Sequence, residues 1–267
     1  MVPLDPEASP PGGTLPLPQG NGPEPAVSGP DLPANAFGRL LALALAAALI
    51  AGAVSVLAGE RILGHYGEAL LPRPSIRPTP EEARRWREAR LYSAVLSFTT
   101  LAGLLGLSMG LAGGLARRAA GASVQAAIAG LLLGIAVVAP IALLLVSNFF
   151  TNYDPHSEDL VFPLLTHGAI WSAVGAIGGL AFGWGIGGRG RWKATLAGGF
   201  FGAAAAAALY EIVGALAFAT SRTELPLSSS IATRGMAQFL VTTLSAIGAV
   251  LTLNQPARRR TSRSIAP

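Results

Sequence analysis

Six long apolar stretches dominate the chain, and each is near or above the ~20 residues that a helix needs to cross ~30 Å of hydrocarbon. Polar residues are concentrated between these stretches and at the two ends of the chain. The pattern predicts an all-α polytopic membrane helix bundle of about six transmembrane helices, in a domain over residues 36–255. The predicted spans are residues 37–59, 92–115, 125–149, 161–187, 194–219 and 231–253.

The two ends of the chain differ in composition from the spans. Residues 1–35 contain ten of the twenty prolines and no Lys or Arg. Such a segment cannot bury enough apolar surface to offset its ordering entropy, so a disordered Pro-rich tail is expected there. Residues 256–267 form a basic C-terminal tail.

Residues 60–91 are predicted to lie outside the membrane and to contain a helix start. Thr79 is followed by Pro80, Glu81 and Glu82. An N-cap threonine, a proline at the first helical position and a glutamate three residues after the cap form a capping box. The helix is expected to continue through the second span.

Overall composition excludes a soluble domain. Charged residues make up 12% of the chain and hydrophobic residues 51%, whereas soluble domains carry roughly 25% charge. The chain has no cysteine, which excludes disulfides, thiol nucleophiles and iron–sulfur clusters.

The basic residues indicate an orientation, because Lys and Arg are retained on the cytoplasmic side. Basic groups follow the second, fourth and sixth spans, and the loop at 151–160 has three acids and no Lys or Arg. Both termini are therefore predicted to be cytoplasmic, with the basic turns and C-terminal tail against anionic lipid headgroups. The seven arginines of residues 60–91 fall on the predicted outer side and disagree with this pattern. Because the basic residues reflect topology, no nucleic-acid partner is expected.

Glycines repeat every four residues in two spans and indicate an internal repeat. After the basic turn, Gly130 and Gly134 in the third span have counterparts in Gly198 and Gly202 of the fifth span. The second and third spans therefore resemble one hairpin, duplicated in parallel as the fourth and fifth. Glycines four apart let two helix backbones approach closely. Helix packing within the chain is the favoured use of these glycine zippers, with a homodimer face as the alternative. The two runs are Gly106, Gly110 and Gly114, and Gly179, Gly183 and Gly187.

A catalytic site is not expected. Residues 106–110 match the G-x-S-x-G pattern around Ser108, and a serine in a six-span protein is typical of rhomboid intramembrane proteases. Counting 1.5 Å per residue from the inner turns, however, places His167 ~15 Å from Ser108 in depth. A nucleophile and its base need a hydrogen bond of ~3 Å. The acidic loop 151–160 has no defined metal-ligand spacing, so we expect no enzyme, no metal and no cofactor.

A layer of polar residues in the outer half of the membrane is the candidate site. His167, Glu211, Arg234 and Gln238 lie at similar predicted heights on three spans. A carboxylate inside a membrane is expensive and marks a functional site by default. In one interpretation Glu211 pairs with Arg234, Gln238 or His167 and locks the helices together. In the other it lines a cavity and binds a proton, a cation or a polar substrate.

Three segments resemble a family of uncharacterised Gly/Ala-rich multi-pass bacterial membrane proteins. They are Thr166–Trp171, Gly178–Gly183 and Leu209–Phe218. The resemblance implies a bacterial inner-membrane location and carries no known activity. Our leading hypothesis is a non-enzymatic structural or assembly component, associated with a membrane-protein partner or a second copy. The alternative is a small transporter or proton-coupled carrier that uses Glu211.

Overall fold

The computed structural model describes residues 34–67, 79–152, 161–188, 190–218 and 221–254. The chain divides into residues 1–31, which lie outside these ranges, and residues 32–267, which contain every described helix. The predicted Pro-rich tail, apart from its last two residues, the basic C-terminal tail and the acidic residues of the 151–160 loop all lie outside the described residues.

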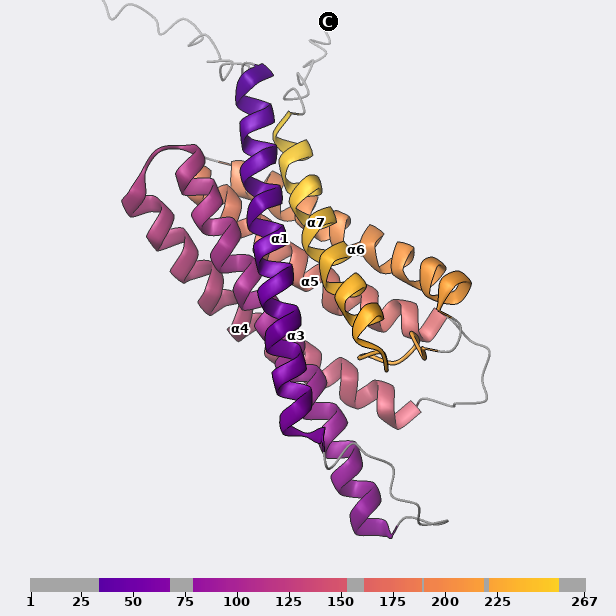
Figure 1. The fold of residues 1–267 in the computed structure, drawn as a ribbon. Helices are drawn as coiled ribbons and strands as arrows, with labels where there is room; N and C mark the ends of the chain where they lie inside the picture. Colours follow the sequence, from indigo (N-terminus) through magenta and orange to yellow (C-terminus); the bar gives the residue numbers. More distant parts are fainter. Residues whose placement is uncertain (1–33, 68–78, 153–160, 189, 219–220, 255–267) are drawn as a thin grey trace, which may run out of the picture. The chain divides into compact units, whose positions relative to one another are not determined.

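All regular secondary structure in the described part of the chain is helical, and the predicted fold class is confirmed. Six helices are long and apolar enough to cross a membrane, which makes this an integral membrane protein. A short 3₁₀ turn follows the last of them, and the described residues contain no strand (Figure 1). The helices are α1 (Ala34–His65), α3 (Pro80–Ala116), α4 (Ala120–Asn152), α5 (Val161–Ile186), α6 (Arg191–Ala217) and α7 (Ile231–Leu251), followed by η1 (Thr252–Asn254).

Helices α1 and α3 extend well into the segment 60–91, which the sequence places outside the membrane. Helix α1 continues to His65, and α3 begins at Pro80 and runs without a break into its apolar part. The predicted capping box is confirmed: Glu82 N donates to Thr79 Oγ1 at 3.3 Å, and Thr79 N donates to Glu82 Oε2 at 3.0 Å.

Successive helices along the chain alternate in direction, so the bundle has two distinct ends (Figure 1). The end of the bundle where α3 turns into α4 and α5 into α6 is called the "turn end". The opposite end, where α3, α5 and α7 begin, is called the "loop end". Helix α5 packs against α3, α4, α6 and α7, while α1 lies against α3 and α7 (Figure 1). Of the most apolar stretch of each helix, 67% is buried in α5 and 56% in α3 but only 22% in α4, so α3 and α5 form the centre.

The glycine run of α3 faces the backbone of α4. A Cβ added to Gly106 would collide with the carbonyl of Gly130, and one added to Gly110 would lie 2.5 Å from the carbonyl carbon of Ala126. One added to Gly114 would overlap the backbone of Ser123. The two helices therefore touch through main-chain atoms, as close small-residue packing in lipid requires.

The α5–α6 hairpin uses its glycines differently. Gly179 and Gly183 of α5 lie against the backbone of α6 near Thr195 and Trp192, much as the α3 run lies against α4. Gly198 and Gly202 of α6, however, face Gly248 and Leu244 of α7, whereas their counterparts Gly130 and Gly134 face α3. Gly198 and Gly202 thus face a different neighbour from their counterparts, because α6 has α7 to pack against, while Gly199 of α6 faces Gly175 of α5.

Gly187, the third glycine of the second run, does not lie in a helix. It follows the end of α5 with φ +74°, a left-handed conformation that glycine adopts without strain. It therefore serves the tight turn into α6. The two central helices also meet through glycine at this end, where Gly113 of α3 lies against Phe182 and Gly185 of α5.

Large apolar side chains cover the outside of the bundle. They include Leu132 and Leu144 on α4, and Phe201 and Leu216 on α6, each more than half exposed. An apolar surface of this extent suits contact with lipid tails.

Candidate functional site

A histidine and a glutamate join α5 to α6 near the loop end. His167 Nδ1 lies 2.6 Å from Glu211 Oε1, and the side chains are 1% and 11% exposed. The other ring nitrogen, Nε2, lies 3.1 Å from the carbonyl oxygen of Leu225 in the loop after α6. One imidazole therefore fastens two helices and a loop.

The partners of His167 determine where its protons lie. A backbone carbonyl only accepts, so Nε2 carries a proton and donates it to Leu225. At Nδ1, either the ring donates to a carboxylate or a carboxylic acid donates to the ring. Both arrangements place a single proton between Nδ1 and Oε1 and leave the pair with no net charge. The pair is thus internally neutral, which reduces the cost of placing it among apolar helices.

Aromatic rings hold the imidazole in position. The centroid of His167 lies 5.3 Å from that of Trp171 and 5.8 Å from that of Tyr210, the latter edge-on at 84°. Trp171 and Tyr210 also pack edge-to-face, with centroids 5.1 Å apart. All three side chains are 2% exposed or less. Such packing restricts the rotamers of the ring and keeps both nitrogens aimed at their partners.

The loop between α6 and α7 is folded back on itself and packed into the bundle. Ser229 N and Oγ both donate to Ser221 O, at 3.2 Å and 2.7 Å, and close the loop at its base. Thr223 packs on Gly214 of α6, where a Cβ would lie 2.7 Å from its hydroxyl oxygen. Leu225 and Pro226 are buried. Irregular backbone at membrane depth is tolerated where protein covers it, and this loop meets that condition.

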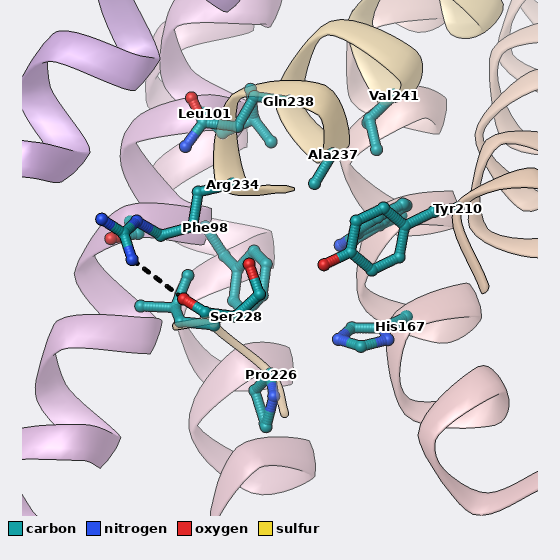
Figure 2. A pocket seen from close by; sticks show the side chains of 13 residues that line it. Phe98, Leu101, His167, Tyr210, Pro226, Ser228, Arg234, Ala237, Gln238 and Val241 are labelled. Atoms are coloured by element: carbon teal, nitrogen blue, oxygen red, sulfur yellow. Dashed lines mark hydrogen bonds between the residues drawn. The ribbon is translucent and has the colours of Figure 1, made fainter. Parts of the chain in front are cut away.

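An arginine and a glutamate join α7 to α1. Arg234 Nε and Nη2 each donate to one carboxylate oxygen of Glu60, both at 2.8 Å. Its Nη1 donates to the carbonyl oxygen of Ser228 at 2.9 Å (Figure 2) and to that of Ser229 at 3.0 Å. The side chains of Arg234 and Glu60 are 14% and 30% exposed. This bidentate geometry is the strongest form of the Arg–carboxylate pair.

A small cavity lies between these two pairs. It is bounded by α3, α5, α6, α7 and the α6–α7 loop, and its volume is about 20 Å³, room for one or two water molecules. Tyr210 directs its hydroxyl into it, and His167 lies beside Tyr210 (Figure 2). Arg234 and Gln238 of α7 lie on its other side.

The structure brings the predicted layer together only in part. His167, Arg234 and Gln238 line the same cavity, and Glu211 adjoins it through its bond to His167. Of the three partners considered for Glu211, the structure selects His167, whereas Arg234 pairs with Glu60.

Ser108 lies outside this site. Ser108 sits inside α3 and donates its hydroxyl to the carbonyl oxygen of Leu105, one turn back in the same helix, at 3.2 Å. No group of three His, Asp or Glu residues with metal-binding geometry occurs in the described ranges.

The sequence pattern alone does not identify several residues of the site. Glu60 was assigned to an extramembrane segment, although it lies in α1 only one residue beyond the predicted span. The carbonyl of Leu225 carries no sequence signal, since any residue supplies one. Ser230 had a usable signal: it is the N-cap of α7 and accepts from Thr233 N at 3.1 Å.

Comparisons with protein-family models, with curated proteins and with solved structures find no match to the chain. The function must therefore be argued from the geometry of the bundle.

Proposed function

We propose that this integral membrane protein is a non-enzymatic structural or assembly component. The observation that carries the proposal is the mutual pairing of its membrane-embedded polar groups. Glu211 is bonded to His167 and Arg234 to Glu60, and each pair joins two helices and the α6–α7 loop. Polar side chains paired in this way hold neighbouring helices of the bundle together.

A carrier carboxylate must be free to exchange its ligand during each cycle. Glu211 is held at 2.6 Å by a histidine whose ring is packed against two further aromatic side chains. Releasing it would leave His167 Nδ1 without a partner in a buried site, at a cost of about 1–3 kcal/mol.

Glycine packing supports the same proposal. The contacts at Gly106, Gly179 and Gly198 are between main-chain atoms of neighbouring helices. Close-packed interfaces of this kind do not slide gradually, because the surfaces interlock. A bundle joined in this way is suited to presenting a fixed surface to lipid and to a partner.

One observation favours a second candidate, a proton-coupled carrier. His167 lies on the cavity wall, while the side chain of its partner Glu211 is 11% exposed on the other side of the bond. The single proton between them thus lies between the cavity beside His167 and the partly exposed side of Glu211.

Two substitutions at Glu211 separate the candidates. In Glu211→Gln the amide can donate to Nδ1 of a neutral His167 that still donates from Nε2. If the pair has a structural role, this variant should therefore have near-native stability. Glu211→Leu removes the partner and should lower the free energy of unfolding by about 2 kcal/mol. Pyranine-loaded proteoliposomes of wild-type protein should acidify no faster than protein-free vesicles after a pH jump. Protein-dependent acidification that Glu211→Gln abolishes would establish the carrier instead.

We further propose that the turn end faces the cytoplasm, with both termini. Five exposed bases lie at this end, and no acid does among the described residues; the bases are Arg39, Arg117, Arg118, Arg191 and Lys193. At the loop end, several arginines stand beside acids, as Arg84 does beside Glu88 at 2.8 Å. The bases of the turn end suit contact with anionic lipid headgroups. We also propose a bacterial inner membrane, an expectation that rests only on the sequence resemblance of Thr166–Trp171, Gly178–Gly183 and Leu209–Phe218, since no family model or curated protein matches the chain.

The absence of cysteine allows a direct test of this orientation. Gly64 and Gly121 lie at opposite ends of the bundle, and a Cβ at either position meets no atom within 4 Å. A membrane-impermeant maleimide added to intact spheroplasts should label Gly64→Cys and should label Gly121→Cys only after permeabilisation. The reverse pattern would place the turn end outside.

A further inference from the structure

The cavity beside the two ion pairs contains more hydrogen-bonding capacity than the protein itself satisfies. Ser97 Oγ, Trp171 Nε1 and Gln238 Oε1 are buried and have no partner, and all three residues line it. Their exposed fractions are 3%, 2% and 8%. In a membrane, a buried polar group without a partner costs several kcal/mol. Three such groups around one cavity indicate that something occupies it.

The groups that face the cavity determine the chemistry of the occupant. Trp171 Nε1 only donates, the amide oxygen of Gln238 only accepts, and the hydroxyls of Ser97 and Tyr210 do both. Among the described residues that line the cavity, the permanently charged cation is Arg234, which is already neutralised by Glu60, and the pair of His167 with Glu211 has no net charge. An ion would therefore find no countercharge there. The site fits a neutral molecule that both accepts and donates.

The volume determines the size of the occupant. About 20 Å³ exceeds the ~10–15 Å³ that one buried water requires. It is far below the ~300 Å³ of a pocket for an organic metabolite. A buried water makes about three hydrogen bonds, so one or two waters supply enough partners for the three unpartnered atoms.

We propose that the cavity is a hydration site, in which one or two water molecules satisfy Ser97, Trp171 and Gln238 and exchange with the water at the loop end. Gly59 of α1 lies beside two of these residues: a Cβ there would be 3.4 Å from Gln238 Nε2 and 3.8 Å from Ser97 Oγ. Arg234 lines the cavity and pairs with Glu60, whose side chain is 30% exposed, so we infer that water enters on this side. The hydration site is independent of the proposed function, since a structural bundle and a carrier both accommodate it.

The cysteine-free chain provides a matched test. Ser97→Cys and Ser55→Cys replace two buried hydroxyls that both lack a partner, and only Ser97 lines the cavity. Each variant, in lipid nanodiscs, is exposed to Ag⁺, which reaches a thiol through water, and the remaining thiol is counted after denaturation. Ser97→Cys should react at least ~10-fold faster than Ser55→Cys, the factor expected for even 1.4 kcal/mol of easier access. Equal rates at the two positions would overturn the proposal.

A second measurement uses the unmodified protein, so that it does not depend on the folding of either variant. Hydroxyl radicals generated by X-ray pulses form at bound water and oxidise the side chains next to it. Trp171 and Tyr210 should be oxidised although each is 2% exposed, while Met109, which is fully buried in α3 outside the cavity lining and oxidises readily, should remain intact. A dry cavity would leave Trp171 and Tyr210 as unreactive as Met109, and the proposal would fail.

Discussion

Two alanine substitutions in the same helix should change stability in opposite directions. Gly179 and Gly168 both lie in α5. A Cβ at Gly179 would collide with the Thr195 carbonyl of α6, with its carbonyl carbon only 2.8 Å away, whereas a Cβ at Gly168 meets nothing within 4 Å. The obstacle at Gly179 is backbone, so no side-chain rotation can relieve it.

The magnitude follows from the contact distance. Carbon atoms pack at ~3.5–4.0 Å, so α5 and α6 must separate by ~0.7 Å or more. Such a gap lowers the attractive energy of each dispersion contact along the interface by about a quarter to a half. Overpacking of this kind costs about 1–3 kcal/mol, against which alanine regains up to ~1 kcal/mol of helix propensity. We expect Gly179→Ala to lose about 1 kcal/mol net and Gly168→Ala to gain up to about 1 kcal/mol. The unfolding equilibria of the two variants should then differ by roughly thirtyfold.

Reversible unfolding in mixed SDS micelles, followed by circular dichroism, measures both free energies under one condition. Wild-type protein provides the reference, and Gly168→Ala controls for the change in helix propensity. If the two variants lie within ~0.5 kcal/mol of each other, the main-chain contact at Gly179 does not hold α5 against α6, and the packing argument is refuted.

Two further substitutions test the ends of the helices. Arg234→Lys keeps the charge but loses the bidentate bond to Glu60 and at least one of the bonds to the loop carbonyls. The free energy of unfolding should therefore fall by about 1–2 kcal/mol. A Lys variant as stable as wild type would show that the bidentate guanidinium geometry contributes nothing. Thr79→Ala removes the N-cap of α3 and should cost about 1 kcal/mol locally. Faster amide hydrogen exchange confined to residues 82–84 would show this, and unchanged exchange there would contradict it.

The topology of this protein was predictable because lipid imposes a simple rule. Each backbone polar group in the hydrocarbon must be satisfied within its own segment, so an apolar run of sufficient length becomes a helix. The start of α3 was predictable for a similar reason, since Thr79 and Glu82 interact with residues only three positions away. Interactions of this range are fully contained in the local sequence.

The partners within the site were not predictable, because they depend on how the helices rotate about their axes. Glu60 and Arg234 are 174 residues apart, and their bond requires α1 to lie against α7. The glycines of α6 gave a misleading signal: Gly198 and Gly202 match Gly130 and Gly134 in sequence but face another helix. A spacing of four residues defines a helix face and leaves open which neighbour that face meets.

The most direct test of the account is the coupling free energy between His167 and Glu211. It is obtained from a double-mutant cycle of His167→Phe, Glu211→Leu and the double variant, unfolded under the same conditions as wild type. If this pair fastens α5 to α6, the coupling should be at least about 1 kcal/mol, above the ~0.6 kcal/mol average for hydrogen bonds between membrane helices. A coupling indistinguishable from zero would contradict the claim that the embedded polar groups serve to hold the bundle together.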